Sequence, residues 1–188
     1  SVLFVTHDQS EALALSDRLA VMRGGEVEQV GEPRDLYEHP GTPAVRDFLG
    51  RTILLPATLR GGSPGEWQVT LAEGADLAVT GMNHHPDARP GASCLLGIRP
   101  EQVEVTPDGS TQGSSASHGT SAAPNTLHAD ILALLFLGDR YEATLRLGSG
   151  ALISVLLPPA EHWREGARVS IHFPAARLQL WPAEATAA

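Results

Sequence analysis

The chain has 188 residues, an apolar fraction of 42% and a formal net charge of −9 at pH 7. This length suits one large or two small domains with hydrophobic cores, and no run reaches the roughly 18 apolar residues of a membrane-spanning helix. The negative charge argues against nucleic-acid binding. The single cysteine, Cys94, excludes an internal disulfide framework, and its neighbours Leu95 and Leu96 indicate a buried apolar position.

The first residues predict a strand followed by a helix. Val2–Val5 is a continuous apolar, β-rich run, which is typical of a strand covered on both faces. Asp8 and Glu11 have the spacing of a helix cap and its capping box, and we favour that interpretation over paired catalytic carboxylates. Because the chain starts within this strand, at Ser1, we expect a fragment of a longer protein.

A hairpin and two short helices are expected next. The Gly24-Gly25 pair fits a two-residue turn between strands at 18–23 and 26–31. Pro33 and Pro43 suit the first turns of two helices, because proline is tolerated at the first helical position.

The pattern changes beyond a boundary at residues 50–53. Ten short β-type runs, punctuated by Gly and Pro, span residues 53–59, 66–71, 75–79, 92–98, 102–105, 127–137, 140–147, 151–157, 168–173 and 178–181. This cadence predicts a barrel or paired-sheet β domain over residues 53–188, and it leaves open a loose twofold repetition of the β segments. Residues 107–124 contain no large apolar side chain and are expected to form a flexible insertion.

The first fifty residues contain a long ordered pattern around one histidine. Thr6-His7-Asp8-Gln9 is followed by Glu11-Ala12-Leu13, Asp17-Arg18, Val21-Met22 and further matching residues through Phe48-Leu49-Gly50. The segment resembles the switch-histidine region of ATP-binding-cassette (ABC) importer ATPases. The resemblance implies that residues 1–52 are a C-terminal α/β remnant of the ATPase domain. It also implies that His7 approaches the ATP γ-phosphate in the complete subunit, whereas from the residues alone His7 could simply cap the following helix.

Two segments of the β region carry a second resemblance. Leu96-Gly97-Ile98-Arg99-Pro100-Glu101 and Phe136-Leu137-Gly138-Asp139-Arg140-Tyr141-Glu142 are similar to the accessory TOBE domain of maltose-, polyamine- and iron-type importer ATPases. The resemblance implies an all-β, OB-like barrel. Arg99 and Glu101 are candidates for binding a small ligand or a partner, although the same pair would also brace a turn.

The missing lysine sets a limit on the chemistry of this chain. All 13 basic residues are arginine, and a P-loop needs its lysine to reach the β- and γ-phosphates. ATP and Mg²⁺ are therefore expected in the parent subunit and not on this chain, which should be inactive alone.

The family resemblance further implies a homodimer that works with transmembrane permease subunits, cytoplasmic and peripheral on the inner face of the membrane, without direct insertion. Iron or polyamine import is favoured. The alternative is a stand-alone solute- or oxyanion-sensing module without ATPase activity.

Two expectations concern the remaining features. His84-His85 is interpreted as a solvated turn rather than a metal site, because adjacent side chains seldom converge on one ion. Residues 2–6 form an apolar strand without its neighbour, so we expect another copy of the chain to pair with it or cover it.

Overall fold

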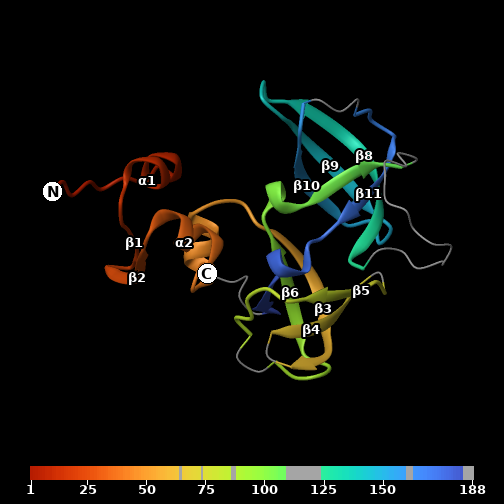
Figure 1. The fold of residues 1–188 in the computed structure, drawn as a ribbon, viewed down its shortest axis with the longest axis horizontal. Coiled ribbons are helices and arrows are strands. Elements are labelled where there is room, and N and C mark those ends of the chain that lie inside the picture. The colour runs from red at the N-terminus through yellow and green to blue at the C-terminus, as the bar shows by residue number, and fades with distance from the viewer. Residues whose placement is uncertain (64, 73, 86–87, 109–123, 160–162, 184–188) are drawn as a thin grey trace, which may run out of the picture. The chain divides into compact units, whose positions relative to one another are not determined.

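The computed structural model describes residues 1–188 except 64, 73, 86–87, 109–123, 160–162 and 184–188. Contacts within the chain divide it into two units, one ending at Thr52 and the other beginning at Ile53. Figure 1 shows short helices and a hairpin in the first unit and β-sheets in the second. Among the described residues, no helix is both long and apolar enough to cross a membrane.

The N-terminal residues differ from the expected strand. Val2–Val5 form no strand, and Val2, Leu3 and Val5 are 95%, 94% and 88% exposed. A strand needs a neighbour to accept and donate its backbone hydrogen bonds, and none of the described strands pairs with these residues. The described residues therefore do not show the α/β remnant expected for residues 1–52.

The rest of the first unit follows the sequence pattern closely. Helix α1 (Gln9–Leu15) precedes strands β1 (Leu19–Arg23) and β2 (Glu26–Gly31), which pair antiparallel, and helices α2 (Pro33–Glu38) and α3 (Pro43–Phe48) follow. Gly24 and Gly25, at φ 61° and 88°, form the expected turn. A small core unites these elements, consisting of Val21, Leu36, Val45 and Leu49.

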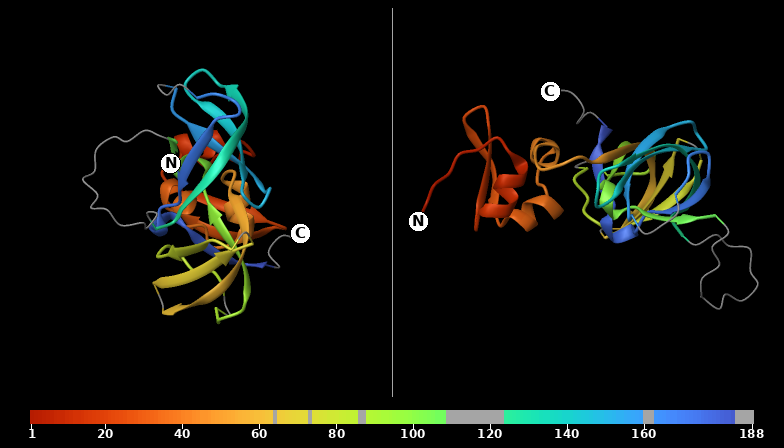
Figure 2. Two further views of the ribbon diagram at one scale, coloured as in Figure 1. Left: turned by 90° about the vertical axis from the view of Figure 1, so that its right-hand side faces the viewer. Right: turned by 90° about the horizontal axis from the view of Figure 1, so that it is seen from above.

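The second unit contains two five-stranded antiparallel sheets (Figures 1 and 2). One has the order β12-β6-β3-β4-β5 and the other the order β10-β9-β8-β11-β7. The strands are β3 (Ile53–Ser63), β4 (Glu66–Leu71), β5 (Asp76–Val79), β6 (Ser93–Ile98), β7 (Glu104–Pro107), β8 (Thr126–Phe136), β9 (Tyr141–Leu147), β10 (Leu152–Leu157), β11 (Arg168–His172) and β12 (Gln179–Pro182). This is a mostly β, OB-like unit. Eight of its strands match the expected runs to within one residue at each end, whereas β3 extends four residues further and β7 is displaced by two.

Alternation along the strands builds one hydrophobic core. In β10, for example, Ile153, Val155 and Leu157 are buried, whereas Leu152, on the opposite face of the strand, is 60% exposed. The same period of two recurs in β3 and β9, as expected for strands that bury one face. The inward side chains of both sheets belong to a single cluster.

The two sheets are built as an internal repeat. The 3-10 helices η1 (Pro100–Gln102) and η2 (Ala175–Arg177) precede β7 and β12, so β3–β7 and β8–β12 have the same element order. Both long strands carry a register shift, at Leu59/Gly61 and at Ile131/Ala133. The twofold repetition that the sequence left open is therefore present.

The halves exchange their last strands. β7 of the first half pairs with β11, and β12 of the second half pairs with β6. Each sheet therefore consists of four strands from one half and one from the other, so that neither sheet is complete without both halves.

The insertion begins later than expected. Pro107 belongs to β7 and pairs with Val169, and the side chain of Asp108 accepts a hydrogen bond from Ser170. Both residues fall in the expected flexible insertion, because that segment has no large apolar side chain, but the pairing with β11 orders them. Residues 109–123 of the predicted insertion lie outside the described residues.

Candidate functional site

His7 lies in a bend directly before helix α1 and is exposed. The cap of that helix is Asp8, whose Oδ1 accepts hydrogen bonds from the backbone N–H groups of Ser10 (2.8 Å) and Glu11 (3.1 Å). Glu11 does not complete a capping box with Asp8. Its carboxylate instead accepts from the Thr6 hydroxyl at 2.8 Å, and Thr6 Oγ1 accepts the N–H of Asp8 at 3.0 Å. Because Asp8 caps the helix, the capping role considered for His7 is already filled.

Arg99 and Glu101 lie at the start of η1, just after β6. Arg99 is the N-cap residue of η1 and only 5% exposed, whereas Glu101 is exposed in the first turn. Pro100 occupies the first helical position, which its fixed φ favours. The turn between β6 and η1 thus places one buried cation beside one surface carboxylate, a geometry suited to bracing the turn.

A residue of the hairpin between β8 and β9 interacts electrostatically with a residue of η1. Arg140 Nε donates to both carboxylate oxygens of Asp139 at 3.0 Å. This hydrogen bond lowers the pKa of Asp139, and it raises the pKa of Arg140, to which the charge of Glu101 also contributes. The charge of Glu101, in the first segment that carries the TOBE resemblance, therefore acts on Arg140 in the second. Asp139 and Arg140 are surface residues, so their ion pair is screened by water.

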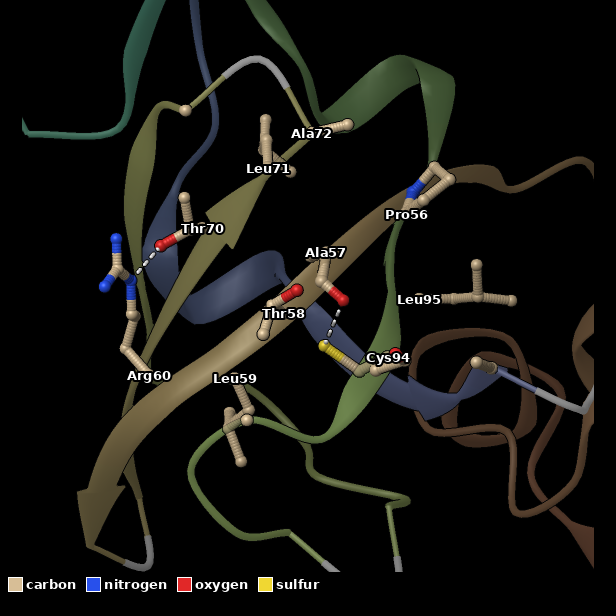
Figure 3. A pocket seen from close by; sticks show the side chains of 14 residues that line it. Pro56, Ala57, Thr58, Leu59, Arg60, Thr70, Leu71, Ala72, Cys94 and Leu95 are labelled. Atoms are coloured by element: carbon tan, nitrogen blue, oxygen red, sulfur yellow. Dashed lines mark hydrogen bonds between the residues drawn. The ribbon is translucent and has the colours of Figure 1, made fainter.

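A broad, open cavity of about 800 Å³ lies against the first sheet (Figure 3). Two of its polar lining side chains are bonded to each other, since Arg60 Nε donates to Thr70 Oγ1 at 2.6 Å. The Thr70 hydroxyl in turn donates at 2.5 Å to Oδ1 of Asp76, which is not a lining residue. The other lining residues come from β3, β4, β6, neighbouring turns and the residue after β12: Pro56, Ala57, Thr58, Leu59, Leu71, Ala72, Gly74, Gly91, Ser93, Cys94, Leu95 and Ala183. The lining offers a guanidinium, hydroxyl groups and apolar side chains, a combination that suits the binding of a small polar solute.

Cys94 in this lining is not a nucleophile. It is 2% exposed, its thiol donates to the carbonyl oxygen of Ala57 at 3.5 Å, and burial raises its pKa to about 11. Since the thiolate is the reactive form, the thiol is inert near neutral pH. The interpretation of Cys94 as a buried apolar residue is confirmed.

The His84-His85 segment is more ordered than a solvated turn. The His84 ring stacks on Trp181 with a centroid distance of 3.9 Å and an interplanar angle of 11°, and its backbone N–H donates to Leu180 at 2.8 Å. The solvated-turn prediction was therefore wrong for His84, because Trp181 from the exchanged strand β12 is distant in sequence. No group of three or more His, Cys, Asp or Glu side chains among the described residues could hold a metal ion.

A polar cluster on the second sheet was missed from the sequence. Ser170 Oγ donates to Asp108 at 2.9 Å, His128 Nδ1 lies 3.4 Å from the same carboxylate oxygen, and Arg168 Nε lies 3.6 Å from the other. The alternation of Arg168, Ser170 and His172 on β11 signalled a polar face. No local pattern indicated that Asp108, in the expected insertion, joins this face.

Comparison with known proteins gives a consistent assignment. A TOBE domain profile matches residues 96–181. The spermidine/putrescine import ATP-binding protein PotA of Methylococcus capsulatus is 32% identical over 178 residues, which are 95% of this chain and 41% of that protein. PotA of Pseudomonas fluorescens is 37% identical over 83% of this chain and 38% of its own length, and PotA of Frankia alni is 45% identical over 57% and 25%.

A solved structure shares the fold of this chain. The cytoplasmic molybdate-binding protein ModG, with molybdate bound, superposes with a TM-score of 0.55 and 19% identity, over 69% of this chain and 95% of that one. The chain spans about two fifths of the length of the relatives from Methylococcus capsulatus and Pseudomonas fluorescens. From the TOBE profile and the PotA similarity together, this chain is a C-terminal part of an ABC importer ATP-binding subunit and contains a TOBE domain.

Proposed function

We propose that this chain is part of the ATP-binding subunit of a polyamine importer. The similarity to a spermidine/putrescine import ATP-binding protein over 95% of the chain carries the proposal. The same name recurs among the other relatives compared, which favours polyamine over the iron alternative.

In the complete subunit, the first unit contributes His7 to the ATP site. A histidine at a helix start, with its neighbouring backbone fixed by the Asp8 cap, is well placed to stabilise charge on the γ-phosphate during transfer. ATP and Mg²⁺ are held by the rest of the subunit, which supplies the P-loop lysine that this chain lacks. Residues 1–52 then complete the α/β ATPase domain, where Val2–Val5 gains the neighbouring strands.

The second unit, residues 53–188, acts as a regulatory and dimerisation domain. The subunit works as a homodimer on permease subunits, at the cytoplasmic face of the membrane. Glu101, next to the buried Arg99 and close to the β8–β9 hairpin, belongs to a surface that contacts a partner.

The test uses the complete subunit assembled with its permease in vesicles. His7→Ala should lower spermidine-stimulated ATP hydrolysis at least about tenfold, equivalent to about 1.4 kcal/mol. Ser10→Ala, a change at an exposed position of the helix that follows His7, serves as the matched control and should leave turnover unchanged. Unchanged turnover in His7→Ala would contradict the role of His7, and absence of spermidine uptake by the unmodified complex would contradict the substrate.

The cavity of the first sheet favours a second candidate, a solute-sensing module. Calorimetry of this chain with spermidine, phosphate, molybdate and ferric ion measures it directly. Saturable binding that Arg60→Ala abolishes would support sensing through the cavity. Absence of heat with every solute would leave dimerisation as the role of this unit.

A further inference from the structure

Thr6, Asp8 and Glu11 are joined by a closed ring of hydrogen bonds that includes the backbone beside His7. The Glu11 carboxylate accepts from the Thr6 hydroxyl at 2.8 Å, and Thr6 Oγ1 accepts from the backbone N–H of Asp8 at 3.0 Å. Asp8 Oδ1 in turn accepts from the backbone N–H of Glu11 at 3.1 Å. Each of the three residues therefore bonds to both others, and His7 lies between two of them in sequence.

This hydrogen-bond ring restrains the backbone of His7. The N–H of Asp8 belongs to the planar peptide unit that joins His7 to Asp8, so its bond to Thr6 Oγ1 fixes how that unit is turned. The Thr6 hydroxyl keeps its position because the Glu11 carboxylate accepts its proton. A fixed peptide unit leaves fewer directions open to the side chain of His7.

The side chain of His7 itself stays outside the ring. It is exposed, and its imidazole forms no hydrogen bond or ion pair with the described residues. A functional side chain needs its backbone and neighbours locked while its own polar atoms stay available for a ligand. The ring and the exposed imidazole together have this arrangement.

Stabilisation of helix α1 accounts for only part of the ring. The bonds that Asp8 Oδ1 accepts from Ser10 and Glu11 satisfy backbone N–H groups at the helix start. The bond between Thr6 and Glu11 joins two side chains and satisfies no backbone group of the helix. An exposed bond of this kind adds little to stability, so its effect lies in where it holds the Thr6 hydroxyl.

We propose that Thr6 and Glu11 are positioning residues for His7. Glu11 orients the Thr6 hydroxyl, the hydroxyl fixes the peptide unit after His7, and the imidazole is thereby presented to the ATP site of the complete subunit. The inference rests on the proposed role of His7 in that site. Neither Thr6 nor Glu11 contacts ATP, and both act through His7. Glu11 thus has a role that neither a capping box nor a pair of catalytic carboxylates describes.

Amide hydrogen exchange tests the ring in the 188-residue chain without nucleotide. Followed by NMR, the N–H of Asp8 should exchange at least about threefold faster in Thr6→Val, which loses the acceptor, and in Glu11→Ala, which releases the hydroxyl. Thr6→Ser and Glu11→Gln keep a hydroxyl and an acceptor oxygen and should stay close to the unmodified chain. Equal exchange in all four variants overturns the proposal.

ATP hydrolysis by the complete subunit, assembled with its permease in vesicles, tests the positioning role. Thr6→Val and Glu11→Ala should each lower kcat at least about threefold with KM nearly unchanged, because misplacement of His7 acts on the transfer step and not on ATP binding. Thr6→Ser and Glu11→Gln should restore most of the loss, and Ser10→Ala remains the matched control.

A double variant separates positioning from a structural effect. When Thr6→Val is added to His7→Ala, a residue that acts only through His7 should cause no further loss of kcat. A residue that merely stabilises the fold should lower kcat by the same factor whether His7 is present or not. The same comparison applies to Glu11→Ala in the His7→Ala background.

The outcomes distinguish this inference from the function on which it rests. Losses in Thr6→Val and Glu11→Ala that vanish in the His7→Ala background support the positioning role. Losses of equal size in both backgrounds, or full turnover in both variants while His7→Ala is impaired, overturn the positioning role and leave the proposed function standing. Unchanged turnover in His7→Ala contradicts the proposed role of His7, and the positioning role fails with it.

Discussion

Asn125 offers the sharpest test of how the second unit is held together. It is 5% exposed and lies just before β8 in the left-handed region, at φ 61°. Its side chain makes three hydrogen bonds, two with Ala78 on β5 and one to Phe173 O at 2.9 Å. One amide thus joins the edge of the first sheet to the chain that leaves β11 in the second.

The expected loss of stability in Asn125→Ala follows from the backbone groups of Ala78 and Phe173 that would lose their hydrogen-bond partner. A buried polar group without a partner costs about 1–3 kcal/mol, and because Ala78 is only half-buried, we take about 2–4 kcal/mol for the three contacts together. Alanine in the left-handed region adds about 1 kcal/mol. Asn125→Ala should therefore lower the free energy of unfolding by about 3–5 kcal/mol, a large part of the 5–15 kcal/mol typical of a domain.

Two companion variants separate the contributions. Asn125→Gly removes the hydrogen bonds without the backbone penalty, so it should be about 1 kcal/mol more stable than Asn125→Ala. Asn125→Asp keeps the acceptor for Ala78 N–H but directs a carboxylate at two carbonyl oxygens, which favours its protonated form in the folded state. Its folded pKa should lie above the unfolded value, so this variant should gain stability relative to the unmodified chain as pH falls.

Urea unfolding followed by tryptophan fluorescence measures these differences. All three tryptophans, Trp67, Trp163 and Trp181, belong to the second unit, so the signal reports this unit alone. A loss below about 1 kcal/mol in Asn125→Ala, the size of one ordinary hydrogen bond, would refute the reasoning. Equal stability of the alanine and glycine variants would refute the backbone part.

Three further predictions concern burial and close packing. Burial raises the pKa of Cys94 from 9.0 to about 11, so its alkylation at pH 8 should be about two orders of magnitude slower in the folded chain than in urea. For the same reason, the free energy of unfolding should fall as pH rises from about 9 toward 11. Fast alkylation of the folded chain would contradict this prediction. Gly81→Ala would place Cβ 2.0 Å from the carbonyl oxygen of Leu178. It should lower the free energy of unfolding by more than about 2 kcal/mol in the same urea assay. Gly148→Ala is the control, because its Cβ would meet open space and the stability should be nearly unchanged. Leu3→Asp should weaken self-association, measured by light scattering, more than the control Leu15→Asp does. Leu3 lies in the exposed apolar segment 2–5, whereas Leu15 is a singly exposed helix residue. Equal masses for the unmodified chain and both variants would exclude pairing through residues 2–6.

Helix caps, turns and strand bounds were predicted well from the sequence, because each of them depends mainly on residues that are close together along the chain. The Asp8 cap and the Gly24-Gly25 turn are confirmed, and strand β4 has the expected bounds of Glu66–Leu71. Val2–Val5 shows the limit of the same reasoning. Its residues are those of a buried strand, yet a strand exists only where another strand pairs with it.

The candidate site was less predictable, because its parts are brought together by pairings that no local pattern specifies. Arg99, Glu101 and Arg140 were singled out from resemblance, and only the fold places the charge of Glu101 close enough to act on Arg140. Trp181 meets His84, and Asp108 meets Ser170, through the strands that the two halves exchange.

Strand exchange also explains why the single residue Asn125 matters beyond its own hydrogen bonds. Each half lacks one strand of its sheet until the other half is folded, so the two halves gain their stability together. Asn125 adds a bond between them at the edge opposite to the exchanged strand, where β5 pairs with β4 alone among the described strands.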